Sequence, residues 1–289
     1  MRERSWCKFD AAFDAEQTDA WFDVARLERV LSDNAALPSV DIYADGHLKR
    51  LTDMQKKSGH SALDVATCCF REGQTVRLRD ADHYDRHLSD LIAAVKRVFV
   101  GATQANIYLT PPRSDGFPPH FDITDVFVVQ LSGAKRWTIF PDYTNRIELP
   151  LPSTDWDPER YTPTDDFTAF ELTPGDVLYL PRGAMHSAAC TERESMHLTI
   201  SLAPATLYDL LTRALAQAAD ADVALRKRVA ATGPDAPTAE EIRSRLVAAL
   251  DEVDLTPILA TMEADREDDV GGWLAEAIAD VRSGLSRPS

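Results

Sequence analysis

The fold is decided by one stretch, Val126-Phe-Val-Val-Gln-Leu-Ser-Gly-Ala-Lys-Arg-Trp-Thr-Ile-Phe140. Two runs rich in β-branched, aromatic and other apolar residues, 126–131 and 136–140, lie on either side of Ser132-Gly133. Such runs are typical of β-strands, and glycine beside serine is typical of a turn. The stretch therefore predicts two short strands joined by a turn.

The same pattern continues on both sides of this stretch. Further runs lie at 105–110, 167–172, 177–181 and 196–202, and turn residues such as Pro111-Pro112 and Pro174-Gly175-Asp176 bound them. Many short strands at even spacing indicate a sandwich or barrel. Residues 150–166 are rich in Pro, Asp and Thr, so we expect a surface loop within the barrel that is a candidate substrate lid.

Helical patterns flank the predicted barrel. Apolar residues recur at helical spacing from Thr18 to Leu31 and again over 83–100. After Pro204 we expect helices at 208–229, at 238–250 behind a Thr238–Glu241 capping box, and at 273–285. The prediction is an α+β chain with a mostly helical support region (1–100), a catalytic barrel (101–204) and a C-terminal helical region (205–289) that forms a bundle.

Composition limits the partners. The formal net charge of −16 argues against nucleic acid, because a phosphate backbone requires a basic surface. No apolar run reaches the roughly 18 residues of a membrane span, and the N-terminal residues lack the apolar core of a secretory signal. The four cysteines have no zinc-ligand spacing, so we expect them to be reduced and the protein to be cytoplasmic.

Three residues have the chemistry of a metal site. His120 and Asp122 lie two apart, which places both side chains on one face of an extended segment, and we expect His186 to join them from a later strand. Two imidazoles and a carboxylate can hold Fe(II) and leave its other face open. A His-x-Asp sequence alone arises by chance; the surrounding predicted strands are what favour a site. The His-Glu-x-x-His signature of helical zinc sites is absent.

Several residues could hold an organic acid beside such a metal. A dicarboxylate such as 2-oxoglutarate would chelate the metal at one end and need a cation at the other. Lys135 begins a predicted strand, while Asn106 and Tyr108 share one strand face, as do His197 and Thr199. Taken singly, these residues could instead be a solvated lysine, barrel-filling side chains and ordinary strand formers.

The quoted motifs resemble a known family. The chain from Asn106-Ile-Tyr-Leu-Thr-Pro-Pro-Arg-Ser-Asp-Gly-Phe-Pro-Pro-His-Phe-Asp122 through Trp137, then Leu172-Thr-Pro-Gly-Asp-Val-Leu-Tyr-Leu-Pro-Arg-Gly-Ala-Met-His186 and His197-Leu-Thr-Ile-Ser201, is similar to the JmjC-type ribosomal oxygenases of the cupin superfamily. The resemblance covers about residues 100–205. It implies a double-stranded β-helix, the jelly-roll barrel of cupins. It also implies Fe(II) on His120, Asp122 and His186, with 2-oxoglutarate on Lys135 near Asn106, Tyr108 and Thr199.

The resemblance also implies an activity. Members of this family use O2 and 2-oxoglutarate to hydroxylate the β-carbon of a histidine or arginine side chain in a protein, with release of succinate and CO2. The residues after Ala205 show no clear winged-helix strand pair, and the family's N-terminal Trp-Glu-Lys-Lys-Pro segment is absent. These departures favour a smaller relative that modifies a histidine in a ribosomally made natural-product precursor peptide.

Other functions remain open at this point. A ribosomal protein could be the substrate, and a non-catalytic metal-binding cupin or a lysine demethylase would share the barrel. We expect the C-terminal helices to form a homodimer interface, and the alternative is that they pack as a cap on the barrel.

Overall fold

The computed structural model describes residues 5–33, 39–44, 47–99, 101–114, 116–154, 156–230, 233 and 236–263. The strands are β1 (Cys7–Phe9), β2 (Val40–Ala44), β3 (His47–Arg50), β4 (Thr75–Leu78), β5 (Gly101–Thr110), β6 (Asp125–Gly133), β7 (Lys135–Phe140), β8 (Thr168–Leu172), β9 (Val177–Leu180), β10 (Met185–Ala189) and β11 (Ser195–Pro204). The helices are α1 (Ala15–Trp21), α2 (Val24–Asp33), α3 (Leu51–Ser58), α4 (Ala62–Arg71), η1 (Ala81–His83), α5 (Arg86–Val98), α6 (Leu207–Ala221), η2 (Val223–Arg226), α7 (Ala239–Asp251) and α8 (Thr256–Glu263).

The strands form two sheets. The large sheet has the order β1-β9-β6-β11-β5-β4-β2-β3, and the small sheet has the order β10-β7-β8. β6 lies antiparallel between β9 and β11, and β7 lies antiparallel between β10 and β8. Along the chain, β6 belongs to the large sheet, β7 and β8 to the small one, and β9, β10 and β11 alternate between the two. This alternation brings segments that are far apart in sequence to the same interior.

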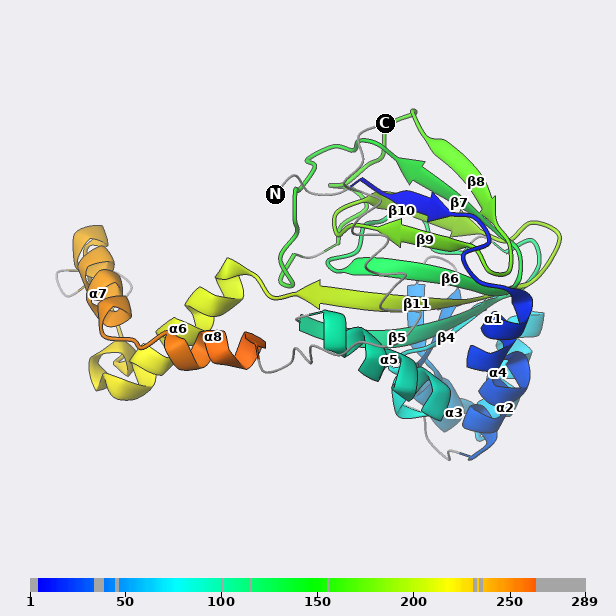
Figure 1. The fold of residues 1–289 in the computed structure, drawn as a ribbon, viewed down its shortest axis with the longest axis horizontal. Coiled ribbons are helices and arrows are strands. Elements are labelled where there is room, and N and C mark those ends of the chain that lie inside the picture. The colour runs from blue at the N-terminus through cyan, green and yellow to red at the C-terminus, as the bar shows by residue number, and fades with distance from the viewer. Residues whose placement is uncertain are drawn as a thin grey trace. The chain divides into compact units, whose positions relative to one another are not determined.

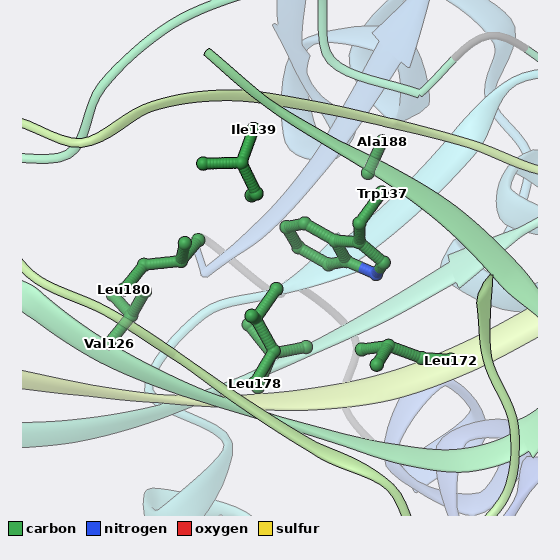
Figure 2. Packing of buried hydrophobic residues seen from close by; sticks show 8 residues of the cluster. Val126, Trp137, Ile139, Leu172, Leu178, Leu180 and Ala188 are labelled. Carbon is green, nitrogen blue, oxygen red and sulfur yellow. The ribbon is translucent and has the colours of Figure 1, made fainter. Parts of the chain in front are cut away.

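One hydrophobic core cluster lies between the two sheets (Figure 2). The large sheet contributes Val126, Val128, Leu178 and Leu180, and the small sheet contributes Trp137, Ile139, Leu172 and Ala188. In β7 the buried residues are Lys135, Trp137 and Ile139, because alternate side chains of a strand point to the same face. The alternation that buries Trp137 therefore buries a lysine as well.

The N-terminal region contains strands as well as helices. Figure 1 shows α1–α4 gathered beside the large sheet, and α1 contacts β6, α3 contacts β2 and α4 contacts β4. The expected helix from Thr18 is divided into α1 and α2, and the expected helix at 83–100 is α5. We expected a mostly helical region and did not predict β2, β3 or β4, which extend the large sheet beyond β5.

Among the described residues, 204–263 belong to a second compact unit, which also includes 96–99 and 101–102. Within it α6 contacts η2, α7 and α8. The predicted capping box of α7 is confirmed, since the Thr238 hydroxyl accepts from the Glu241 N–H and the Glu241 carboxylate accepts from the Thr238 N–H. The helix expected at 273–285 lies outside the described residues. No helix in the described part of the chain is both long and apolar enough to cross a membrane.

The six strands that the sequence predicts are all present, each with bounds shifted by a few residues. The strand that carries His186, β10, is the element of the barrel whose bounds the sequence did not predict. It contains Met185, Ser187 and two alanines, which do not form an alternating apolar pattern. Its pairing with β7 is what makes it a strand.

We predict that Gly133→Ala destabilises the protein more than Gly59→Ala does. Both glycines have positive φ, which costs an alanine about 1–2 kcal/mol. A Cβ at Gly133 would also overlap the Glu194 carbonyl oxygen, because Gly133 pairs with Ser195 of β11, whereas Gly59 has open space. The overlap adds about 1–3 kcal/mol. Urea unfolding of both variants measures the difference, and equal destabilisation would contradict the close strand contact.

Candidate metal centre

A backbone pair brings the two histidines together. The His120 N–H donates to the His186 carbonyl at 2.9 Å, and the His186 N–H donates to the His120 carbonyl at 2.7 Å. This antiparallel bridge holds the imidazole rings with their centroids 4.4 Å apart. Two main-chain hydrogen bonds therefore hold side by side two residues that lie far apart in the sequence.

Asp122 joins the histidines from the same segment as His120. Its carbonyl accepts a hydrogen bond from the Gly183 N–H at 2.9 Å, which ties it to the turn before β10. Asp122 Oδ2 lies 3.8 Å from His186 Nε2, and one ligand atom from each of the three residues lies within 4.8 Å of the others. The structure thus brings together all three residues that the sequence selected.

Both imidazoles present the same nitrogen to the centre of this group. His120 Nδ1 lies 2.7 Å from the Pro118 carbonyl oxygen, and His186 Nδ1 lies 2.9 Å from the Ala184 carbonyl oxygen. A carbonyl only accepts, so Nδ1 carries the proton in each ring and Nε2 keeps a free lone pair. A hydrogen-bonded Nδ1–H and a free Nε2 are what metal-binding histidines require.

Burial keeps His186 neutral. Desolvation, followed by the nearby His120 ring, lowers the pKa of His186 to about 4, while Asp122 acts in the opposite direction. A neutral imidazole is the form that binds a metal. Two nitrogen ligands and one carboxylate would fit a divalent first-row ion such as Fe(II).

The three residues line a cavity of about 380 Å³. Four of the five residues expected to contact an organic acid also line it, namely Lys135, Tyr108, His197 and Thr199. Asn106 does not line this cavity; its side-chain oxygen accepts from Gln104 Nε2 at 3.0 Å and from the Asp80 N–H at 3.3 Å. A cofactor contact by Asn106 stays a prediction.

Lys135 is a buried cation in the cavity wall. Its side chain is 1% exposed, and Nζ donates to Thr110 Oγ1 at 2.9 Å. Among the described residues no carboxylate lies within salt-bridge distance of it. Burial lowers its pKa to about 8. A buried ammonium without a counter-ion fits a site that receives an anion.

Two orphaned polar atoms border the same cavity. His197 Nδ1 and Trp137 Nε1 are buried and have no hydrogen-bond partner among the described residues. His197 stacks on Tyr108, with ring centroids 4.7 Å apart and planes within 4°. Burial, with Lys135 nearby, lowers the pKa of His197 well below its usual value. These atoms are available to a polar ligand beside Lys135.

Sequence reasoning did not select Thr110, Trp137 or Arg77, which contribute to the site. Thr110 lies two residues after Tyr108 on the same strand face, so the alternation used for Tyr108 could have found it. Trp137 is related to Lys135 in the same way and stacks on His186 at a centroid distance of 5.7 Å. Arg77 comes from β4, which was not predicted; its Nη2 donates to Asp41 at 2.6 Å and it lines the cavity.

We predict that the affinity for 2-oxoglutarate falls as the pH rises above about 8. A carboxylate binds the protonated Lys135, and the pKa of about 8 means that free protein loses this proton above that pH. Affinity should be nearly constant below pH 7 and fall by up to about tenfold per pH unit above pH 8. Calorimetric titration of the Co(II)-loaded protein between pH 6.5 and 9.5 measures this.

Lys135→Met is the control for this prediction. This variant should bind 2-oxoglutarate weakly at every pH, and its affinity should not fall further above pH 8. A wild-type affinity that stays flat up to pH 9.5 would contradict a role for the Lys135 charge.

Comparison with known proteins shows which families this chain resembles. The JmjC domain model matches residues 79–210. The bifunctional lysine-specific demethylase and histidyl-hydroxylase NO66 of Drosophila simulans is 35% identical over 170 residues, which cover 55% of this chain and 19% of that protein. Ribosomal oxygenase 1 of Bos taurus is 29% identical over 184 residues, which cover 62% of this chain and 27% of that protein. This chain therefore spans about a quarter or less of the length of these relatives.

A solved structure shares the fold. The structure of E. coli ycfD matches with a TM-score of 0.51 and 15% identity, over 88% of this chain and 66% of that chain. At this identity the likeness concerns the fold alone. Residues 79–210 of this chain are therefore similar to the JmjC domain, and the curated proteins that the chain resembles include a histidyl-hydroxylase and a ribosomal oxygenase.

Proposed function

We propose that this chain is an Fe(II)- and 2-oxoglutarate-dependent dioxygenase that hydroxylates an amino-acid side chain of a peptide or protein. One observation carries the proposal: two free Nε2 atoms and a carboxylate converge in a cavity that also contains a buried lysine, which has no counter-ion among the described residues. A non-catalytic cupin would not need this buried ammonium, which costs free energy unless an anion binds it.

The residues divide into two binding groups. His120, Asp122 and His186 would hold Fe(II) as a two-histidine, one-carboxylate site. Lys135 would bind the distal carboxylate of 2-oxoglutarate, with Thr110 holding its ammonium group. Tyr108, Thr199 and His197 would border the cosubstrate, and Asn106 is proposed as a more distant contact.

The barrel supplies the frame for this chemistry. We infer that the strands alternating between two sheets form a double-stranded β-helix, in which the His120–His186 bridge extends the small sheet beyond β10. Iron with 2-oxoglutarate and O2 supplies oxidative decarboxylation to succinate and CO2 and the insertion of one oxygen atom into a C–H bond. The protein binds and orients the reactants, and the apolar wall around Trp137 excludes water.

Histidine is the proposed target side chain, with hydroxylation at the β-carbon, and arginine is a possible alternative. The histidyl-hydroxylase named among the relatives supports this choice. We propose a ribosomally made natural-product precursor peptide as the substrate, and the net charge of −16 suits a basic peptide. A ribosomal protein is the second candidate, which the relative named ribosomal oxygenase 1 favours.

The C-terminal region is proposed to form a homodimer. α6 exposes Leu207, Leu211 and Leu215, which are four residues apart and therefore lie on one face of the helix. α7 exposes Ile242 and Leu246 in the same way. Large exposed apolar side chains at helical spacing are typical of an interface.

We propose that residues 1–100 form a support region, residues 101–204 the catalytic region and residues 205–289 a helical region. We also propose a cytoplasmic location, because all four cysteines are free.

We predict that the protein forms a weak charge-transfer absorption band when Fe(II) and 2-oxoglutarate are added without O2. Such a band arises when the keto acid chelates the iron, so it reports the ternary complex directly. Asp122→Ala should lose both the band and succinate formation, because one of three protein ligands is gone. Succinate formation that survives in Asp122→Ala would show that these residues do not form the metal site.

We further predict a mass gain of one oxygen atom in a histidine-containing substrate. Wild-type enzyme, Fe(II) and 2-oxoglutarate should be incubated with candidate precursor peptides and, separately, with purified ribosomal proteins. Tandem mass spectrometry then locates the modification, and Asp122→Ala is the control. Loss of methyl groups from lysine would instead indicate a demethylase. Hydroxylation of the ribosomal proteins alone would rule out a precursor peptide as the substrate.

A further inference from the structure

A buried aromatic cluster lies directly behind the metal ligands. Its members are Phe121, Tyr143, Tyr161 and Met185, with Phe140, Ile147 and Trp156 packed against it. Phe121 separates the ligands His120 and Asp122 in the sequence, and Met185 precedes the ligand His186. The two tyrosines come from residues 141–167, the segment between β7 and β8, here called the insertion.

Tyr143 connects the insertion to the ligand segment through its ring and its hydroxyl. The ring stacks on Phe121 with centroids 5.6 Å apart and planes 27° apart. The hydroxyl donates to the Gly183 carbonyl at 3.0 Å and accepts from the Ile147 N–H at 3.3 Å. The side chain is 4% exposed, so water does not compete freely for these bonds.

Gly183 links Tyr143 to Asp122 through two hydrogen bonds. The Gly183 N–H donates to the Asp122 carbonyl at 2.9 Å, so one residue joins the Tyr143 hydroxyl to the backbone of the carboxylate ligand. Gly183 has a φ of +82°, and a Cβ there would lie 3.0 Å from the Ile147 carbonyl oxygen and from Pro150 Cδ. The insertion therefore packs tightly against this turn.

Asp122 depends on its backbone for position. Its side chain is 39% exposed, and among the described residues its carboxylate accepts no hydrogen bond. His120 and His186, in contrast, are each fixed by a ring nitrogen bonded to a carbonyl. The hydrogen bond from the Gly183 N–H therefore fixes the Asp122 backbone, and a shift of the Gly183 turn would move the carboxylate.

The insertion is closed at its base by bonds between its two ends. The Thr144 N–H donates to the Thr162 carbonyl at 2.9 Å, the Thr164 N–H donates to the Asp142 carbonyl at 3.2 Å, and Asn145 Nδ2 donates to the Arg160 carbonyl at 2.9 Å. Opening it as a lid would break these bonds and expose the aromatic cluster. The geometry suits a fixed support.

We propose that Tyr143 is a positioning residue that holds the Asp122 carboxylate in place for metal binding through Gly183, and that the base of the insertion is a rigid support rather than a moving lid. This inference rests on the proposed metal site. It assigns a role to Tyr143 and Gly183, which hold Asp122 in place, and no new role to the three proposed metal ligands.

The test is the affinity of metal-free protein for Co(II), measured by calorimetry. Tyr143→Phe keeps the ring and removes the hydroxyl, so Co(II) affinity should fall about tenfold, as is usual when a group that orients a metal ligand is lost. Tyr161→Phe removes a hydroxyl from the same cluster without touching Gly183, and its Co(II) affinity should stay within about twofold of the wild type. Melting temperatures of the metal-free variants are measured alongside.

The outcomes separate the inference from the proposed function. Wild-type affinity in Tyr143→Phe, or equal losses in both variants that follow their melting temperatures, would overturn the positioning role alone. A wild-type protein that does not bind Co(II) would overturn the metal site itself. Amide hydrogen exchange over 142–147 should be the same with and without 2-oxoglutarate in the Co(II)-loaded protein, whereas stronger protection with the ligand would show a lid.

Discussion

The pair of main-chain hydrogen bonds between His120 and His186 is the constraint on which the site depends. It sets two residues from distant parts of the chain opposite one another, at 2.7 and 2.9 Å. The sheets determine where this pair can form, because β10 is held by β7 and β7 carries the central Trp137 of the core. A change that moved β10 away from the His120 segment would therefore separate the two histidines.

The interior of the barrel serves two purposes with one strand pattern. In β7 the alternation that places Trp137 and Ile139 in the core, as Figure 2 shows, also buries Lys135. Burial makes the charged form of Lys135 unfavourable and lowers its pKa to about 8. A carboxylate bound beside the ammonium group would offset this desolvation cost. The same burial keeps His186 neutral and ready to bind a metal. Stability and ligand binding are therefore coupled through a few interior positions.

Support for the site extends beyond the residues that face the cavity. Thr110 accepts hydrogen bonds from both Lys135 and Thr75, so the ammonium group is oriented by a buried hydroxyl network. On the other side, carbonyl groups of Pro118 and Ala184 orient the two imidazoles. Positions that carry no obvious chemistry in the sequence thus fix the geometry of those that do.

The sequence by itself determined the strands of the barrel, the capping box of α7 and the choice of His120, Asp122, His186 and Lys135, because periodicity and residue chemistry are local properties. Only the tertiary structure decided that β2, β3 and β4 extend the large sheet, where β10 begins and ends, and that Asn106 lies off the cavity wall. It also decided that Arg77 lines the cavity and that Tyr143 contacts Phe121 and Gly183. Each of these depends on pairing or packing between residues far apart in the chain, and the alternation of polar and apolar residues does not encode which partners meet.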